Sequence, residues 1–344
     1  MTLLRDLRIE GVFREPQFTD LGLEHVPFDE LTNTNAVEQP LLDGIRAGGS
    51  AAVTGARGSG KSSVLAWVCR NLPDDHIPIR VPVVGMDDPS DPSVLGSVAL
   101  GAALEAARVQ DDVELGADQR ARVENARADA TTRRPGGSRL GGKLGGGPVP
   151  LEVSTELGSL ETEYARGVQP VDRLYGFDRL LGIFTHHGLI PVFVLEDTEA
   201  ALGAGTDDET RDRFFASSLR LLIREVDTPT VIAVQSAFTQ LDAYDELRPH
   251  VLEIAVPVLE HGVEASLSSI LARRLEFFGI NATVEETVAP EAIPALAAFY
   301  AEKGGSVRHV LAALDAATAT AVENGDVRLE LGHIRLGIED WRDR

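Results

Sequence analysis

Residues 55–62 read Gly-Ala-Arg-Gly-Ser-Gly-Lys-Ser, which is the spacing GxxxxGK(S/T). A short apolar run, 50–54, precedes them, and an apolar run, 63–69, follows. The context predicts a strand, a glycine-rich turn and a helix, in which backbone amides and the helix N-terminus surround a phosphate chain. The candidate phosphate-binding residues are Gly55, Ala56, Arg57, Gly58, Ser59, Gly60, Lys61, Ser62 and Ser63.

Two side chains of this loop have separate expected roles. Lys61 is expected to reach the β- and γ-phosphates, and the Ser62 hydroxyl is expected to ligate Mg²⁺. The alternative is a chance glycine turn, and the correct flanking strand and helix argue against it. The chain has only three lysines, Lys61, Lys143 and Lys303. A lysine kept at the one position where a P-loop needs it therefore indicates a chemical requirement.

Length, composition and charge restrict the class of protein. The 344 residues have room for one large or two medium domains, and 43% of them are hydrophobic, which is enough for a core. No apolar stretch of about 18 residues predicts a membrane span, and the N-terminus lacks the pattern of a signal peptide. The single cysteine, Cys69, excludes an internal disulfide. We therefore expect a cytoplasmic protein. Its net charge of -22 favours solubility and repels nucleic acid unless positive charge is locally concentrated.

Hydrophobic periodicity predicts the fold class. Apolar runs without alternation are separated by segments of helical spacing, which is typical of a parallel α/β sheet. The expected strands are 50–54, 77–84, 189–195, 229–235 and 251–256, and the expected helices are 34–46, 63–69, 91–109, 171–187 and 208–226. After residue 262 the pattern is helical throughout. We expect a lead-in that contributes to the nucleotide pocket, a P-loop NTPase sheet flanked by helices, and a small all-helical lid, over 1–49, 50–257 and 258–344.

One segment interrupts the alternation of expected strands and helices and contains a stretch without acidic residues. Residues 110–170 form an insertion, and within it residues 130–151 contain no acid but four bases, Arg133, Arg134, Arg139 and Lys143. A mobile linker is the simpler interpretation. The alternative is a projecting hairpin that contacts a polyanion or an acidic partner.

Further candidates stand at the ends of the expected strands. Glu196 and Asp197 follow an apolar strand, at the sheet edge where parallel sheets bind ligands, and are candidate Mg²⁺ ligands and catalytic acids. Two solvated acids are the alternative. Gln235 ends the next strand and is a candidate for holding the attacking water, or is simply a polar residue at a strand end. Arg248 precedes the last expected strand. It is either a surface arginine or an arginine that reaches into the site of a neighbouring subunit.

Arg308 lies in the first turn of a helix that follows Gly304-Gly305-Ser306. A cation there opposes the helix dipole and costs roughly 0.3–1 kcal/mol when unpaired. A γ-phosphate would remove that cost, and so would one of the many carboxylates of the chain.

The order of these features resembles AAA+ ATPases, in the branch that holds the origin-recognition initiators and bacterial relatives of the STAND type. Residues 55–62 are similar to that branch's Walker A motif, 268–274 to its first lid helix, and 305–311 to its sensor-2 motif. The resemblance covers about 30–107 and 170–344. It implies that Glu196-Asp197 is Walker B, that Gln235 is sensor 1, that Arg248 is the arginine finger and that Arg308 is the sensor-2 arginine.

Two departures from the family pattern bear on activity. Walker B in the family ends in Asp-Glu, or in Asp-Asp among STAND relatives, whereas this chain has Glu196-Asp197. We therefore expect binding to survive and hydrolysis to be slow. Initiators of this branch also carry a C-terminal winged-helix DNA reader, and Arg344 follows directly on the lid, so we expect none here.

Two functions follow from the resemblance. The first is an ATP- and Mg²⁺-dependent homo-oligomer with active sites at subunit interfaces, a motor or regulator that acts on nucleic acid, through 130–151 or through a protein partner. The second is a slow nucleotide-gated switch that controls an effector protein, for example in a defence or mobile-element system. A hydrolysis-dead scaffold ranks last, since Lys61 and Ser62 are intact.

Overall fold

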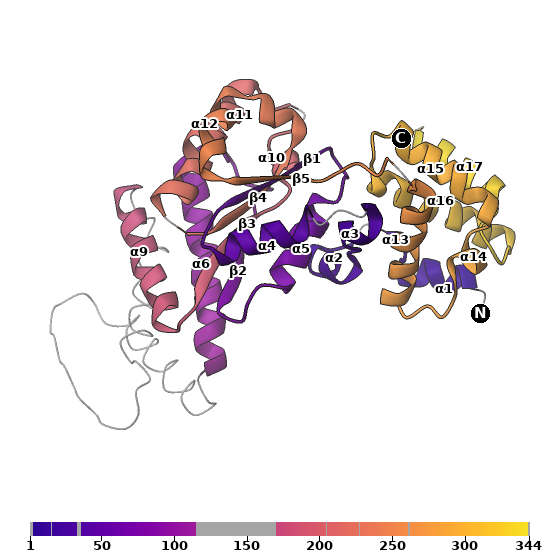
Figure 1. The fold of residues 1–344 in the computed structure, drawn as a ribbon, viewed down its shortest axis with the longest axis horizontal. Helices are drawn as coiled ribbons and strands as arrows, with labels where there is room; N and C mark the ends of the chain where they lie inside the picture. The colour runs from indigo at the N-terminus through magenta and orange to yellow at the C-terminus, as the bar shows by residue number, and fades with distance from the viewer. Residues whose placement is uncertain are drawn as a thin grey trace.

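The computed structural model describes residues 3–14, 16–32, 36–114, 170–203, 205–226, 228–260 and 262–342. Its centre is a parallel sheet of five strands in the order β2-β3-β4-β1-β5 (Figure 1). The strands are β1 (Ala51–Gly55), β2 (His76–Val81), β3 (Ile190–Leu195), β4 (Thr230–Gln235) and β5 (Leu252–Ala255). The predicted fold class, a P-loop sheet flanked by helices and followed by a helical region, is confirmed.

The sheet separates two hydrophobic cores, because successive side chains of a strand point to opposite faces. Along β3, Val192 and Val194 belong to one core, whereas Phe193 and Leu195 belong to the other. Helices α4 (Glu38–Arg46) and α5 (Lys61–Arg70) cover the first face, and α6 (Pro92–Glu114) and α9 (Pro170–His186) cover the second. Burial on both faces explains why the strands read as continuous apolar runs.

The segment after β3 keeps its predicted apolar stripe but not its predicted geometry. Instead of one α-helix over 208–226, the chain forms α11 (Asp208–Arg213) and then two π-helical segments, η1 (Phe214–Leu219) and η2 (Leu221–Glu225). The predicted stripe is nevertheless buried, at Phe214, Phe215, Leu219, Leu222 and Ile223. The short elements α10 (Thr198–Ala201), η3 (Ser236–Gln240), α12 (Asp242–Leu247) and η4 (Arg248–His250) complete the turns around the sheet.

The helical region follows β5 and lies beside the sheet (Figure 1). It consists of α13 (Val263–Phe277), α14 (Val284–Thr287), η5 (Pro290–Ala292), α15 (Ile293–Glu302), α16 (Val307–Asn324) and α17 (Leu331–Arg342). The N-terminal helix α1 (Leu3–Glu10) packs against α16, so the start of the chain is part of this helical layer. Helices α2 (Phe18–Glu24) and α3 (Phe28–Thr32) then connect it to α4 and α5.

Several element boundaries lie a few residues from the predicted ones. The predicted strand 77–84 ends at Val81, the predicted helix 34–46 begins at Glu38, and the predicted helix 91–109 continues to Glu114. The bases Arg133, Arg134, Arg139 and Lys143 lie outside the described residues, so the prediction of a polyanion contact stays untested. Within the described residues, the helices are all too short or too polar to traverse a lipid bilayer.

Candidate functional site

The glycine-rich turn between β1 and α5 passes twice through the left-handed region of backbone conformation. Gly58 and Gly60 have φ values of 75° and 102°, in the left-handed region that glycine adopts without strain. A Cβ at Gly58 would lie 2.1 Å from the Ser306 hydroxyl, so only glycine fits. The helix begins directly at Lys61, which places its N-terminal amides at the turn. The Ser59 hydroxyl is buried and has no hydrogen-bond partner among the described residues.

Lys61 is buried at the closed end of this turn. Its ammonium donates hydrogen bonds to the carbonyl oxygens of Gly55 at 3.1 Å and Ala56 at 2.8 Å, and to Glu199 Oε2 at 3.0 Å. The side chains of Lys61 and Glu199 are only 6% and 13% exposed. Burial lowers the pKa of Lys61, and the Glu199 carboxylate opposes that shift.

The residues after β3 bring acids to the same place. Asp197 is the one non-glycine residue with positive φ, 52°, in the described part of the chain, and it precedes the short helix α10. The Thr198 hydroxyl donates to the carbonyl oxygen of Ala233 on β4, which holds this turn against the sheet. Asp197 and Glu199 both line the cavity in front of Lys61.

Glu196, the other predicted Walker B acid, points elsewhere. Its carboxylate pairs with Arg80 on β2, whose guanidinium stacks 4.4 Å from the ring centre of Phe18. Burial raises the pKa of Glu196, and Arg80 opposes that shift. Burial also raises the pKa of Cys69 to about 12. Because Glu196 pairs with Arg80, it does not line the cavity that Asp197 and Glu199 border.

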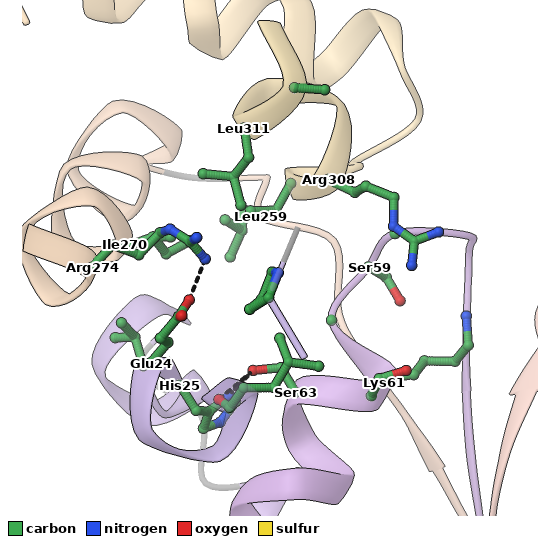
Figure 2. A pocket seen from close by; sticks show the side chains of 18 of the residues that line it. Glu24, His25, Ser59, Lys61, Ser63, Leu259, Ile270, Arg274, Arg308 and Leu311 are labelled. Atoms are coloured by element: carbon green, nitrogen blue, oxygen red, sulfur yellow. Dashed lines mark hydrogen bonds and ion pairs between the residues drawn. The ribbon is translucent and has the colours of Figure 1, made fainter. Parts of the chain in front are cut away.

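The helical region contacts the glycine-rich turn directly through the start of α16. Ser306 caps this helix by accepting from the His309 N–H, and the Val307 N–H donates to the Gly58 carbonyl oxygen at 3.1 Å. Arg308 follows and lines the cavity on the side of Ser59 and Lys61 (Figure 2). Its positive charge contributes to lowering the pKa of Lys61.

These groups border a cavity of about 340 Å³, within the range of small-ligand sites. The phosphate-loop residues occupy one end, and the other end is mostly apolar (Figure 2). The apolar wall comes from the N-terminal segment and the helical region, at Phe13, Leu21, Val26, Phe28, Leu31, Leu259, Ile270 and Leu311. Sequence reasoning did not identify these residues, because apolar side chains give no signal that separates a ligand wall from a core.

A buried ion pair fixes that apolar end. Arg274 of α13 pairs with Glu24, and both side chains are 4% exposed. Arg274 also donates to the carbonyl oxygens of Val12 at 2.6 Å and Arg14 at 2.8 Å, so it joins the helical region to the N-terminal segment. Burial raises the pKa of Glu24, and Arg274 opposes that shift. Glu24 Oε1 has no hydrogen-bond partner among the described residues.

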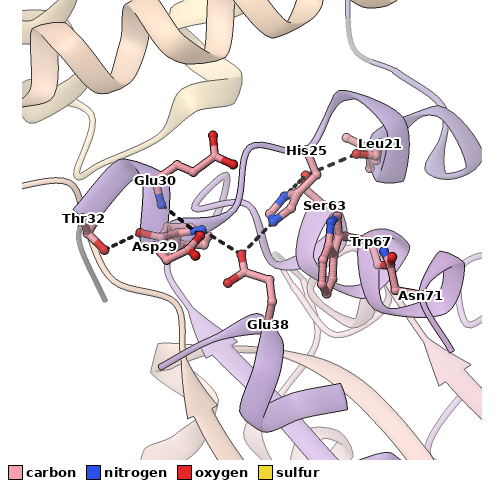
Figure 3. A network of polar contacts seen from close by, with 10 residues as sticks. Leu21, His25, Asp29, Glu30, Thr32, Glu38, Ser63, Trp67 and Asn71 are labelled. Atoms are coloured by element: carbon pink, nitrogen blue, oxygen red, sulfur yellow. Dashed lines mark hydrogen bonds and ion pairs between the residues drawn. The ribbon is translucent and has the colours of Figure 1, made fainter. Parts of the chain in front are cut away.

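A second polar network joins the N-terminal segment to the helix of the phosphate loop (Figure 3). His25 lies between Ser63 and Glu38, at 2.8 Å from the Ser63 hydroxyl and 2.7 Å from Glu38 Oε1. The Phe28 N–H donates to the same Glu38 oxygen at 3.0 Å. Burial raises the pKa of Glu38, but the hydrogen bonds from His25 and Phe28 outweigh it, so the net shift is downward.

The remaining predicted residues lie outside the cavity wall. Gln235 ends β4 opposite Gly55 in the sheet register, close in the fold to the phosphate loop. Arg248 lies in η4 and is 47% exposed, where it pairs with Asp245 at 2.8 Å and Glu253 at 3.1 Å. Arg57 is exposed at the edge of the turn. The structure thus brings together Gly58–Ser63, Asp197 and Arg308, but not Glu196, Gln235 or Arg248.

No protein-family model and no curated protein sequence matches the chain. Among solved structures, ORC2 of Aeropyrum pernix in its ADPNP-ADP complexes matches with a TM-score of 0.51 and 13% identity, over 96% of this chain and 71% of that chain. Its ADP form matches with a TM-score of 0.51 and 14% identity, over 96% and 72%. ORC1 of the same organism in complex with DNA has a TM-score of 0.49 and 16% identity, over 94% and 69%. The two ORC2 matches show that this chain has a fold similar to that of ORC2, a parallel P-loop sheet followed by a helical region.

Proposed function

We propose that this protein binds ATP with Mg²⁺ in the cavity between the sheet and the helical region, and hydrolyses it. One observation carries the proposal: a phosphate-binding loop with a buried lysine opens into a cavity of about 340 Å³ whose far end is apolar. The site lies where the proposed segments 1–49, 50–257 and 258–344 meet.

The residues of the cavity fit the parts of such a ligand. The amides of residues 58–62 and the Lys61 ammonium suit phosphates, and the unpartnered Ser59 hydroxyl is one further donor. Mg²⁺ prefers oxygen ligands and is commonly held by one or two carboxylates together with phosphates. Ser62 and Asp197 would hold it, and the ion when bound would neutralise phosphate charge. Glu24 Oε1 is an acceptor suited to a base amino group.

Arg308 is the proposed sensor of the terminal phosphate. It reaches the cavity from the helical region, whereas Lys61 reaches it from the sheet. An anion between these two cations would hold the two parts of the protein together, because one phosphate group would then contact Lys61 of the sheet and Arg308 of the helical region at the same time. Binding of a triphosphate therefore favours the closed arrangement more than binding of a diphosphate does.

The proposed biological role is that of an oligomeric ATPase in a process linked to nucleic acid. Arg248 is half exposed and lies outside its own cavity, as an arginine that completes a neighbouring subunit's site would have to be. Direct contact with nucleic acid would use residues 130–151, and a protein partner is the other route. If the site is shared, turnover per subunit rises with protein concentration, and Arg248→Ala lowers it. Turnover unchanged by Arg248→Ala would exclude a shared site of this kind.

A nucleotide-gated switch is the second candidate, and the orientation of Glu196 favours it. Glu196 pairs with Arg80 and does not face the glycine-rich turn. The residues proposed to bind the nucleotide are therefore in place, whereas one of the two acids predicted to support hydrolysis is not. The bond between Val307 and Gly58 would transmit phosphate binding to the helical region. Turnover measured with and without DNA separates the candidates, since rapid DNA-stimulated hydrolysis contradicts the switch.

Equilibrium dialysis with labelled ATP and Mg²⁺ tests the proposal that both candidates share. Lys61→Ala removes the ammonium proposed to contact the phosphates and is expected to reduce affinity about 10- to 150-fold, since a buried charge-assisted contact is worth roughly 1.5–3 kcal/mol. Lys303→Ala is the matched control, because Lys303 ends α15 outside the cavity wall. Uptake by Lys61→Ala equal to that of the wild type would contradict the proposed site.

A further inference from the structure

Glu199, which the sequence motifs do not single out, pairs with Lys61 at the glycine-rich turn. We propose that Glu199 is the internal counter-ion of Lys61 and that a nucleotide phosphate must displace it. The displaced Glu199 carboxylate makes tight nucleotide binding depend on Mg²⁺. The proposal rests on the proposed nucleotide site and concerns how that site is regulated.

Glu199 completes the hydrogen bonding of the Lys61 ammonium. A lysine ammonium has three N–H donors and no acceptor. Two of them are accepted by the loop carbonyls of Gly55 and Ala56, and the third by Glu199 Oε2. Because all three are used, a phosphate oxygen can reach Lys61 only by replacing one of these partners. The two carbonyls belong to the loop itself, so the carboxylate is the partner that can leave.

The surroundings of α10 fix the backbone at Glu199. The turn before it passes through Asp197 at φ 52°, a conformation that costs a non-glycine residue roughly 1–3 kcal/mol and persists only where the surroundings impose it. After it, the carbonyl oxygens of Leu202 and Gly203 accept from Arg211 at 2.9 and 2.8 Å. A Cβ at Gly203 would lie 2.3 Å from the Glu199 carbonyl oxygen. The backbone of α10 is therefore fixed, and only the Glu199 side chain is free to rotate.

A Glu199 carboxylate displaced from Lys61 keeps its negative charge close to the cavity. Glu199 is 13% exposed, so a carboxylate released from Lys61 remains in a poorly solvated site with Asp197 and the arriving phosphates. Uncompensated like charges of this kind disfavour binding. A divalent cation removes the repulsion, because it prefers carboxylate and phosphate oxygens. The Glu199 carboxylate therefore weakens the binding of metal-free nucleotide and has much less effect on the binding of nucleotide that carries Mg²⁺.

The test compares wild type with Glu199→Gln, which keeps the shape of the side chain and removes its charge. Calorimetric affinities are measured for ATP, for its non-hydrolysable imido analogue and for AMP, each in EDTA and in Mg²⁺. We expect Glu199→Gln to tighten metal-free ATP and imido-analogue binding about tenfold, as loss of one charge-assisted contact implies. The gain in affinity on adding Mg²⁺ shrinks by the same factor, and AMP, which lacks the outer phosphates, is unaffected.

Glu209→Gln is the matched control, since this exposed residue of α11 undergoes the same change outside the cavity wall. Glu199→Asp is a second variant whose shorter carboxylate retracts from Lys61, and its metal-free affinity is expected to lie between those of wild type and Glu199→Gln. If Glu199→Gln leaves the metal-free affinity and the Mg²⁺ effect as in the wild type, the proposal is overturned while the nucleotide site stands. If wild-type protein takes up no nucleotide under any condition, both fail.

Discussion

The backbone N–H of Val307 donates to the carbonyl oxygen of Gly58 at 3.1 Å, which joins the helical region to the glycine-rich turn. The two residues are far apart in sequence, and their contact depends on the missing side chain of Gly58, since a Cβ there would meet Ser306. The turn is therefore shaped to accept the start of α16 on one side, and the proposed phosphate site lies on the other. We expect changes at this contact to affect both nucleotide binding and the position of the helical region.

Gly58→Ala is expected to destabilise the protein by roughly 1–3 kcal/mol, because it combines a left-handed backbone with a Cβ only 2.1 Å from the Ser306 hydroxyl. It should also weaken nucleotide binding. Gly48→Ala is the matched control: Gly48 has φ 81° but nothing within 4 Å of its Cβ position. Urea unfolding and calorimetric titration measure both effects. Equal losses in the two variants would show that backbone strain alone is responsible and that the contact with α16 has no role.

Arg308→Ala is expected to weaken ATP binding about tenfold and ADP binding much less, because the guanidinium would contact only the terminal phosphate. Calorimetric titration of both nucleotides measures the ratio. Arg335→Ala, at an exposed position of α17, controls for the loss of one positive charge from the helical region. Equal weakening of ATP and ADP would assign Arg308 to a part of the nucleotide that both share.

Arg274→Ala is expected to cost about 3–5 kcal/mol of unfolding free energy, since it leaves the buried Glu24 carboxylate without its partner. The adjacent Arg273→Ala is the control, because Arg273 is 43% exposed and its pair with Glu276 should contribute less than about 1 kcal/mol. Urea unfolding measures both. Adding Glu24→Ala to Arg274→Ala should cost much less than Glu24→Ala alone, and full additivity would show that the pair is not coupled.

Glu38 gives the protein a pH dependence with a definite sign. Its pKa in the folded protein is lower than the ordinary value of 4.5, because the hydrogen bonds from His25 and Phe28 outweigh the effect of burial. Its contribution is therefore fully present above pH 4.5 and is lost as the pH falls through the lowered value. We expect Glu38→Gln to be less stable than wild type at neutral pH, with a difference that shrinks on acidification. Urea unfolding across this range measures it, and a difference independent of pH would contradict the expectation.

Much of the architecture could be predicted, because local chemistry determines it. The spacing of residues 55–62 between apolar runs indicates the strand, the turn and the helix, since glycines and the lysine are required there individually. Runs such as 189–195 and 231–234 are apolar throughout because both faces of the sheet are covered. The register of α11 and the π-helical segments was not predictable, since the same stripe of Phe214, Phe215 and Leu219 fits either helix.

The acids show what the pattern alone leaves open. Glu196, Asp197 and Glu199 stand within four positions, and the motif points to the first two. In the structure the left-handed turn at Asp197 directs Glu199 to Lys61, while Glu196 pairs with Arg80 from a strand more than a hundred residues earlier. Which of these acids lies beside Lys61 depends on the backbone angle at Asp197 and on the pairing of Glu196 with Arg80. Neither can be predicted from the local sequence.

The sequence by itself determined that this chain forms a parallel P-loop sheet with a helical region after it, because glycine placement, a lysine and hydrophobic periodicity act over a few residues each. Only the tertiary structure decided what closes the cavity and which charges meet inside it. Its apolar wall and the pairs of Lys61 with Glu199 and Arg274 with Glu24 join segments separated by more than a hundred residues. Contacts at that separation follow from how the layers pack, which no local pattern specifies.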